Sequence, residues 1–322
     1  MISETSTEKI LVIGALGQIG KELTEALRNK YGKERVIASD IREPDFDNAP
    51  HITLNVLDKE ALISCIREHE IKVIFNLAAI LSAKGEENPQ MAWQINMDGL
   101  LNSLEAARET DISRIFWPSS IAVFGPGSPR QNTPQDCIMD PNTVYGISKL
   151  AGERWCAYYT EKYGLDIRSL RYPGLIGYKG AAGGGTTDYA VDIFHEALKS
   201  GNFTSFLDKG TYLPMMYMPD AINATLRLME APRETLKVRT SYNLAGISFS
   251  PDEIAAAIQR HIPEFKMAYG PDYRQAIADS WPQSVDDSAA QKDWNWEAAY
   301  DLESMVKDML LHLRERYKAV GA

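Results

Sequence analysis

The chain has 322 residues, of which 44% are hydrophobic and 24% are charged. These proportions are ordinary for a globular protein, and the length suits one large domain or two closely joined ones. Its 34 Lys and Arg residues against 44 Asp and Glu residues give a net charge of −10. That balance argues against an exposed nucleic-acid-binding surface.

The cysteines and histidines suggest neither a disulfide framework nor a metal site. Cys65, Cys137 and Cys156 are widely spaced and odd in number, which fits a reducing, cytoplasmic compartment. The five histidines are scattered, so we expect no zinc site. Residues 1–9 lack the apolar core of a signal peptide, and no apolar run is long enough to span a bilayer.

Short apolar runs alternate with helix-length segments through the first half of the chain. Strands are predicted over 9–14, 35–40, 72–79, 114–120 and 166–174, and helices over 18–31, 59–70, 90–109 and 145–163. Short apolar strands separated by helices predict a parallel sheet that is covered on both faces. The predicted fold is therefore α/β, with a doubly wound, Rossmann-like parallel sheet over residues 1–177.

The alternation loosens after about residue 177, where Gly, Thr and Pro interrupt it. We expect a helix over 219–230, a strand over 241–246 and a final amphipathic helix over 301–318. Another helix begins after Ser250, with Pro251 in its first position and Glu253 completing a capping box. Residues 178–322 are predicted to form a smaller substrate-binding region that returns a strand and a helix to the main sheet.

A glycine-rich turn links the first predicted strand to the first predicted helix. Gly14 permits the tight turn, Gly17 lets the backbone approach a pyrophosphate, and Gly20 lets helix and strand pack closely. The N–H groups at the start of the helix, those of Gln18 and Ile19 included, face an anion along the helix dipole. This pattern predicts dinucleotide binding.

Asp40 ends the second strand, 20 residues after Gly20. A carboxylate there accepts hydrogen bonds from both hydroxyls of the adenosine ribose and repels a 2′-phosphate, so it favours NAD over NADP. Ile41 and Arg42 follow in the same predicted site. Arg42 weakens the preference, because an arginine there can pair with a 2′-phosphate.

Two further stretches belong to the predicted cofactor site. Asp58 follows the third strand, and the sequence leaves two readings open: contact with the adenine amino group, or a helix N-cap. Leu77, Ala78 and Ala79 follow the fourth strand. Their stretch presents small side chains where ribose and pyrophosphate pass close to the backbone.

Tyr145 and Lys149 lie four residues apart on a predicted helix, so they share one face. A lysine ammonium close to a tyrosine, whose reference pKa is about 10, favours the phenolate. The phenolate can take a proton from a substrate hydroxyl while a hydride leaves the same carbon. Ser119 and Ser120 end the fifth strand, where sites form in parallel sheets, and a serine hydroxyl there can hold the substrate oxygen.

Together, the three glycines, "NLAA" (76–79), Ser119-Ser120 and "YGISK" (145–149) resemble the extended short-chain dehydrogenase/reductase superfamily. That group contains the nucleotide-sugar epimerases, and the resemblance spans essentially the whole chain. It implies Ser120 as catalytic serine, Asn96 as the asparagine of the active-site relay, and nicotinamide contact from Tyr172, Pro173 and Leu175. It also implies a homodimer packed through helices near 90–109 and 145–163.

Three stretches, 118–126, 168–198 and 281–296, are similar to the short-chain type of L-threonine 3-dehydrogenases. Those enzymes oxidise the C3 hydroxyl of L-threonine with NAD and make 2-amino-3-oxobutanoate. The resemblance therefore implies L-threonine as a small-molecule substrate. Ile121 and Phe124 depart from common epimerase usage, but both changes are conservative.

The run Gly183–Gly185 follows the predicted nicotinamide segment, so it should lie over the reactive end of the cofactor. The hydroxyls and carboxylate that come after it suit a small zwitterion, whereas a nucleotide sugar needs cations for its diphosphate, and Lys179 is the only one nearby. Glycines also let such a loop close over substrate. The predicted substrate contacts are Ser82, Ser119, Ser120, Tyr145, Thr186, Thr187 and Asp188.

Two other functions stay open. A nucleotide-sugar epimerase or dehydratase of the same superfamily would show no net redox change, so NADH production from threonine alone separates it from a dehydrogenase. A non-catalytic NAD-sensing protein would have no reason to keep Ser120, Tyr145 and Lys149 together.

Overall fold

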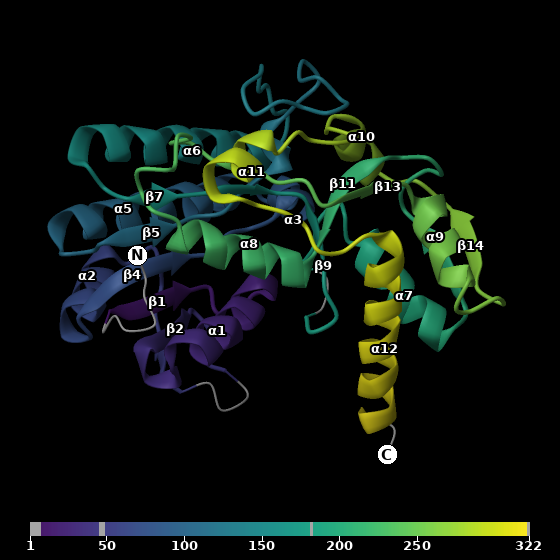
Figure 1. The fold of residues 1–322 in the computed structure, drawn as a ribbon, viewed down its shortest axis with the longest axis horizontal. Coiled ribbons are helices and arrows are strands. Elements are labelled where there is room, and N and C mark those ends of the chain that lie inside the picture. Colours follow the sequence, from purple (N-terminus) through teal and green to yellow (C-terminus); the bar gives the residue numbers. More distant parts are fainter. Residues whose placement is uncertain (1–7, 45–48, 181–182, 321–322) are drawn as a thin grey trace.

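The computed structural model describes residues 8–44, 49–180 and 183–320. Six parallel strands form its main sheet, in the spatial order β3-β2-β1-β4-β5-β7 (Figure 1). They are β1 (Lys9–Ile13), β2 (Val36–Asp40), β3 (His51–Thr53), β4 (Ile71–Asn76), β5 (Arg114–Phe116) and β7 (Ile167–Arg168). Strand order reverses between β1 and β4, which confirms the predicted doubly wound α/β fold.

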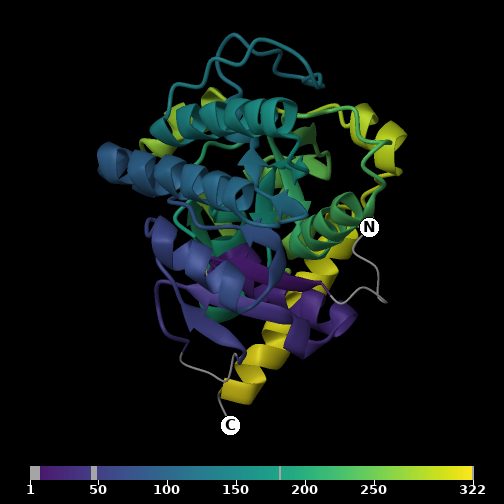
Figure 2. The ribbon, with the colours of Figure 1, turned by 90° about the vertical axis from the view of Figure 1, so that its left-hand side faces the viewer.

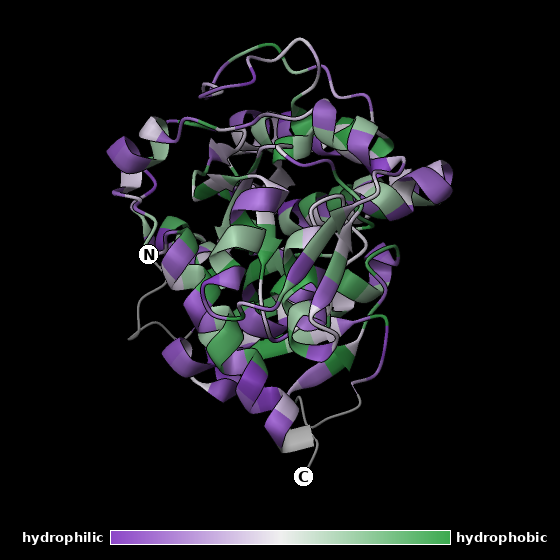
Figure 3. Cartoon of the chain, turned by 90° about the vertical axis from the view of Figure 1, so that its right-hand side faces the viewer, coloured by the Kyte–Doolittle hydropathy of each residue, from purple (hydrophilic) through white to green (hydrophobic). Residues whose placement is uncertain are grey.

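Helices cover both faces of this sheet because its strands are apolar on both sides. Ile10 and Val12 pack against α1 (Gln18–Tyr31) and α8 (Met218–Glu230), while Leu11 and Ile13 point to the other face. That other face carries α2 (Lys59–Glu68), α5 (Gly99–Glu109) and α6 (Val144–Tyr163). Figure 2 shows α5 and α6 side by side, and Figure 3 shows hydrophobic residues concentrated in the interior.

Prolines divide two of the predicted strands, because proline has no N–H for the ladder. Pro118 separates β5 from β6 (Ser119–Ser120). Pro173 separates β8 (Leu170–Tyr172) from β9 (Gly174–Ile176). The chain therefore changes sheets at the carboxyl end of the main one, where the predicted site residues lie.

The predicted helix over 90–109 is also interrupted. It consists of α4 (Pro89–Trp93), a π-helical turn η2 (Gln94–Asp98) and α5. A short helix that the sequence analysis missed, α3 (Ser82–Glu87), precedes it. Two 3₁₀ turns, η1 (Lys33–Arg35) and η3 (Ile121–Val123), follow α1 and β6.

The C-terminal part adds one strand, β12 (Tyr242–Asn243), to a separate three-stranded sheet of order β12-β8-β6, not to the six-stranded main sheet. β12 pairs in parallel with β8, which itself pairs with β6. A third sheet has the order β13-β11-β9, and a fourth joins β10 to β14. The remaining strands are β10 (Asn202–Ser205), β11 (Leu213–Tyr217), β13 (Ile247–Phe249) and β14 (Lys266–Tyr269). The division of the chain at residues 177 and 178 stays a prediction.

Five further helices surround the smaller sheets, and α7, α9 and α12 pack on one another there. They are α7 (Tyr189–Lys199), α9 (Pro251–Gln259), α10 (Arg274–Asp279), α11 (Ser288–Trp294) and α12 (Leu302–Val320). The predicted capping box at α9 is confirmed, with the Ser250 N–H donating to Glu253 Oε2 at 3.2 Å.

Two expectations concern residues that lie outside the described ranges. The signal-peptide argument rests mainly on residues 1–7, and Ala181 and Ala182 belong to the predicted glycine loop. Across the residues that are described, no helix has both the length and the apolar character needed to cross a membrane.

Candidate active site

The glycine turn between β1 and α1 is built so that only glycine fits. Gly14 has a φ of +79°, and a Cβ on it would lie 2.9 Å from the Ala78 nitrogen. A Cβ on Gly20 would lie 2.2 Å from the Gly14 oxygen. At Gly17, no described side chain caps the start of α1, so the helix presents its first N–H groups to an incoming anion.

A groove follows the carboxyl ends of β1, β2 and β4. One part of about 380 Å³ lies between Asp40 and residues 54–57, and a second part of about 530 Å³ lies over the start of α1. Eleven predicted cofactor residues line it: Gly14, Gly17, Gln18, Ile19, Gly20, Asp40, Ile41, Arg42, Leu77, Ala78 and Ala79. The side-chain nitrogen of Gln18 is buried there without a hydrogen-bond partner among the described residues.

Asp40 is held rigidly at the end of β2. Its Oδ2 accepts from the Leu16 N–H at 3.1 Å, while its Oδ1 accepts from Arg42 N at 3.2 Å and Arg42 Nε at 3.1 Å. Arg42 is therefore ion-paired with Asp40. Arg42 was the residue that weakened the prediction of NAD over NADP, and Asp40 is the residue on which that prediction rests. The glycine cradle, the orphaned Gln18 amide and this carboxylate together fit an adenosine diphosphate with free ribose hydroxyls.

Asp58 is a helix cap. Its Oδ1 accepts from the Ala61 N–H at 2.9 Å at the start of α2, and its side chain is exposed. The groove is lined instead by the four residues 54–57 that precede it. Of the two readings of Asp58, the structure therefore supports capping and places the side chain outside the predicted adenine site.

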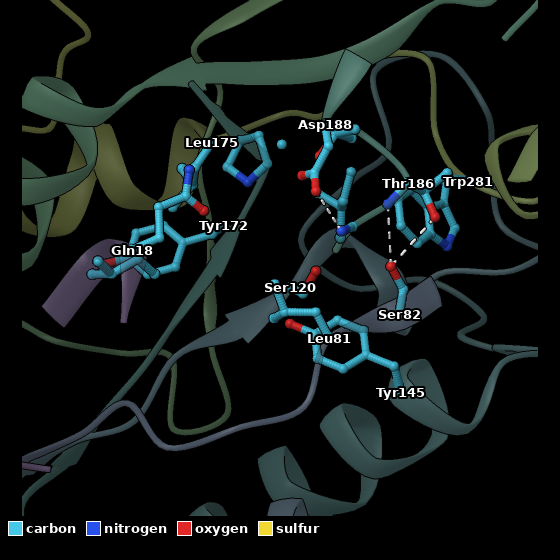
Figure 4. A pocket seen from close by; sticks show the side chains of 16 residues that line it. Gln18, Leu81, Ser82, Ser120, Tyr145, Tyr172, Leu175, Thr186, Asp188 and Trp281 are labelled. Atoms are coloured by element: carbon cyan, nitrogen blue, oxygen red, sulfur yellow. Dashed lines mark hydrogen bonds between the residues drawn. The ribbon is translucent and has the colours of Figure 1, made fainter. Parts of the chain in front are cut away.

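A smaller cavity of about 100 Å³ continues the groove over the start of α6. It shares Gln18, Ile19 and Leu81 with the groove. In Figure 4, Ser82, Thr186 and Trp281 lie together on one side, and Gln18, Tyr172 and Leu175 lie on the other. The predicted residues that line it are Ser82, Ser120, Tyr145, Tyr172, Pro173, Leu175, Thr186, Thr187 and Asp188.

The two serines of β6 point in opposite directions, because successive side chains of a strand alternate. Ser120 lines the cavity and is hydrogen-bonded to the Tyr145 phenol. Ser119 is buried and donates to Glu153 Oε1 at 2.7 Å, behind the cavity wall. The prediction that Ser119 contacts substrate therefore does not agree with where its side chain lies.

Tyr145 is the second residue of α6, and Thr143 caps the helix by accepting from the Gly146 N–H at 3.1 Å. Burial raises the pKa of Tyr145 to about 12, and its hydrogen bond with Ser120 opposes that rise. Lys149 is not exposed to the cavity; its Nζ donates to the Pro118 carbonyl at 2.6 Å and lies 5.5 Å from the centre of the Tyr145 ring.

Burial also lowers the pKa of Lys149, to about 7. Burial therefore sets the direction of both pKa shifts in this structure, and the lowering of the Tyr145 pKa by Lys149 stays a prediction. Loss of hydration dominates at both groups, and it favours the neutral form of each.

Asn96 holds two segments of the site together through hydrogen bonds. It lies in η2, and its Oδ1 accepts from the Ile80 N–H at 2.8 Å while its Nδ2 donates to Ser148 Oγ at 3.2 Å. Ser148 Oγ donates in turn to the Tyr145 carbonyl at 2.7 Å. Asn96 thus ties the end of β4 to the first turn of α6, and π-helical turns of this kind are frequent at functional sites.

The loop before α7 reaches the cavity through its threonines. The hydroxyls of Thr186 and Ser82 are both buried and lie 3.3 Å apart. The Asp188 carboxylate accepts from the N–H groups of Gly184 and Gly185, both at 2.7 Å, and does not cap α7. Burial raises the pKa of Asp188. This carboxylate therefore braces its own loop while lining the cavity.

Sequence reasoning missed two residues at the site. Lys84 on α3 lines the groove, and a Cβ on Gly184 would lie 2.8 Å from its Cε, so its stem covers the loop. Lys179, the cation expected nearby, instead pairs with Glu25 at 2.6 Å. Trp281, which follows α10, closes the cavity. The stretch 281–296 begins with this residue and was similar to the threonine dehydrogenases, but no local sequence pattern indicated that the Trp281 side chain would lie in the site.

Known proteins resemble this chain over nearly its full length. A partial consensus L-threonine 3-dehydrogenase has 56% sequence identity and a TM-score of 0.94, covering 95% of this chain and 99% of that one. A monomeric L-threonine 3-dehydrogenase from a metagenome has 46% identity and a TM-score of 0.93, at coverages of 95% and 99%. An uncharacterized epimerase/dehydratase of Staphylococcus aureus (strain MRSA252) is 48% identical over 314 residues, 96% of this chain and 98% of its own.

A family profile covers most of the same region. The profile of the NAD dependent epimerase/dehydratase family matches residues 10–245, which include the glycine turn, Asp40, Ser120, Tyr145 and Lys149. The groove described above has the shape and the hydrogen-bonding groups that this cofactor requires. The chain therefore belongs to the NAD dependent epimerase/dehydratase family, and NAD is its cofactor.

Proposed function

We propose that this protein oxidises the C3 hydroxyl of L-threonine to 2-amino-3-oxobutanoate. The observation that carries the proposal is the cavity of about 100 Å³ beside Tyr145, closed by Trp281 and lined by the hydroxyls of Ser82 and Thr186. A cavity of this size suits an amino acid better than a nucleotide sugar. The similarity to L-threonine 3-dehydrogenases supports the same substrate.

In this proposal Tyr145 and Ser120 act on the substrate hydroxyl. Bound NAD supplies the hydride acceptor and a positive charge. Ser120 holds the substrate oxygen, and the Tyr145 oxygen takes its proton. A general base works best when its pKa is near the working pH, so a pKa of about 12 must fall before Tyr145 can act. The cationic form of Lys149, close to the Tyr145 ring, lowers it.

The polar ends of the amino acid meet the other wall of the cavity. Ser82 and Thr186 offer two buried hydroxyls whose mutual contact of 3.3 Å is longer than a usual O–H···O bond. Both can therefore turn toward a ligand at little cost. Asp188 places a carboxylate at the same wall, with its other bonds going to the loop backbone.

The test is production of NADH, followed at 340 nm, from NAD and a panel of 3-hydroxy and other amino acids. We expect L-threonine to be the preferred substrate and Tyr145→Phe to be inactive under the same conditions. UDP-glucose serves as the control substrate for the alternative reading as a nucleotide-sugar epimerase or dehydratase. Conversion of UDP-glucose without net NADH, and no NADH from threonine, would contradict the proposal.

We further propose that the protein is a cytoplasmic homodimer that packs through the helical segment near 90–109, which comprises α4, η2 and α5, and through α6. Large apolar side chains are exposed on α6 and α4, among them Ile147, Trp155, Met91 and Trp93. The described cysteines are free, as a reducing compartment requires. Light scattering coupled to gel filtration measures the mass in solution; the mass of one chain would contradict the dimer.

A further inference from the structure

Behind the cavity, a fully buried ion pair joins α6 to β8. Glu153 and Arg171 are 0% and 1% exposed. Arg171 Nε donates to Glu153 Oε1 and Arg171 Nη2 donates to Oε2, both at 2.8 Å. Ser119 Oγ donates to Oε1 at 2.7 Å. The carboxylate therefore accepts three hydrogen bonds in a region without solvent contact.

Each member of this group adjoins a residue of the site without lining the cavity itself. Glu153 lies one helical turn after Lys149, and Ser119 directly precedes Ser120. Arg171 directly precedes Tyr172, which does line the cavity. The group therefore lies behind two lining residues, Ser120 and Tyr172, and next to Lys149.

Stability alone does not explain a charged pair in this place. Desolvation of two charges can exceed their attraction, and well-packed apolar replacements of a buried ion pair are often neutral or stabilising. What distinguishes this pair is a third buried charge beside it. Lys149 is 2% exposed, and Pro118 is its one hydrogen-bond acceptor among the described residues.

Among the described titratable groups near Lys149, Glu153 is the one that carries a negative charge. Tyr145 and Cys156 also face it from α6, but burial raises the pKa of both, so both are neutral near pH 7. Arg171, across from α6, faces Glu153. Glu153 therefore favours the charged form of Lys149, against the burial that lowers the lysine pKa.

We propose that Glu153, with Arg171 and Ser119, is a positioning residue that keeps Lys149 charged and Ser120 aligned with Tyr145. This inference rests on the role proposed for Lys149 above. Arg171 also connects this group to other segments, because its Nη1 donates to the Gln135 carbonyl at 2.8 Å and to Asn243 Oδ1 at 3.0 Å. The catalytic helix is thereby tied to β12.

The test replaces both charges at once, with E153Q/R171M, so that no unpaired charge stays buried. NAD affinity is measured against pH by calorimetry, without threonine, so the result stands whether or not threonine is the substrate. Because Glu153, and not Arg171, raises the pKa of Lys149, we expect the loss of affinity at high pH to begin at a lower pH than in the wild type, by roughly one pH unit or less. Identical pH dependence would overturn the inference.

The control is a second buried ion pair, Arg168 with Asp166, whose side chains are 1% and 8% exposed and whose carboxylate also pairs with Arg114. It lies at the start of β7, at the opposite end of the sheet from the site. D166N/R168M should lower the melting temperature and leave the pH dependence of NAD binding unchanged. An equal shift in both double variants would assign the effect to lost stability and overturn the inference.

Ser119→Ala keeps the test decisive if the double variant does not fold. It removes one of the three hydrogen bonds on Glu153 and leaves both charges in place. We expect the onset of affinity loss to move in the same direction by a smaller amount, with a lower melting temperature because a buried hydrogen bond to a carboxylate is lost. An unchanged onset in this variant would count against the proposal.

Discussion

At the scale of single residues, we predict that Asp40 decides which dinucleotide the groove accepts. Its carboxylate is buried and pinned by the Leu16 N–H and Arg42. Asp40→Ala should lower kcat/KM for NAD by about 10- to 100-fold, since one hydrogen bond to a charged group contributes about 1.5–3 kcal/mol. The gap to NADP should narrow, and kcat/KM measured with both cofactors checks this.

Arg42→Ala is the matched control for Asp40. It removes the exposed partner and leaves the carboxylate, so the preference for NAD should persist. Equal use of NAD and NADP by the unaltered protein would contradict the role given to Asp40.

Tyr145 carries the second prediction at this scale. Tyr145→Phe keeps the ring and removes only the proton acceptor, so kcat should fall by about 10²–10⁴-fold while NAD still binds. Because burial raises the pKa of Tyr145, kcat of the unaltered protein should increase with pH over the neutral range. Steady-state rates and a separate NAD titration check both statements; near-normal kcat in the variant would assign the proton to another group.

At the scale of elements, a substitution at the start of α2 can distinguish the two roles that the sequence left open for Asp58, which are a helix N-cap and a contact with adenine. Asp58→Ala removes the hydrogen bond to the Ala61 N–H and should cost about 0.5–2 kcal/mol of stability. NAD affinity should not change. Thermal unfolding and an NAD titration test this; weaker NAD binding at an unchanged melting temperature would restore the adenine contact.

The loop before α7 is the second element with a testable role. Thr186→Ala should raise the KM for threonine by roughly tenfold, because one hydrogen bond lost from a small substrate is about 1.4 kcal/mol. NAD binding should stay the same. Gly201→Ala, at a positive φ outside the site, is the control for loop strain alone. An unchanged KM in Thr186→Ala would show that this loop only connects its neighbouring elements and does not contact the substrate.

Local patterns predicted the elements that local contacts build. α1 is found at the predicted 18–31, and α6 starts one residue before the predicted 145. Thr186 and Ser82 were predicted to share one site, but sequence reasoning did not predict the pairing of Arg171 with Asn243, which are distant in the chain. Periodicity carries no information about such pairs.

Other misses have a different cause. The break at Pro118 follows from the missing proline N–H and was open to prediction, whereas the π-helical turn after Trp93 keeps a helical hydrophobic pattern and could not be found by periodicity. The sequence also suggested a lowered pKa for Tyr145 from its spacing to Lys149. Spacing gives proximity, but the degree of burial decided the direction of the shift.

At the scale of the whole molecule, one buried carboxyl makes stability depend on pH. Burial raises the pKa of Glu22 from 4.5 to about 7, with Lys179 and Glu25 nearby, and its Oε1 has no hydrogen-bond partner within the described chain. The folded protein then binds more protons than the unfolded chain between about pH 4.5 and 7, so stability falls as pH rises through that window.

Glu22→Gln should therefore stabilise the protein at pH 8 by about 1–3 kcal/mol and change it little at pH 4.5. Thermal unfolding of both proteins at the two pH values measures the difference. Glu25→Gln, on the same helix but exposed, is the control and should show no such pH dependence. A gain of equal size at both pH values would trace the effect to packing.

Trp281 lies outside the 10–245 region that the family profile spans, yet it closes the cavity. Its segment is fastened to an earlier one, with the Gln283 N–H donating to the Arg130 carbonyl at 2.6 Å and the Asp286 N–H to the Thr133 carbonyl at 2.9 Å. The segment that closes the cavity therefore lies outside the residues that the family profile matches. Libraries designed for new amino acid substrates should vary residues 279–286 and 128–133 together and leave the glycine turn untouched.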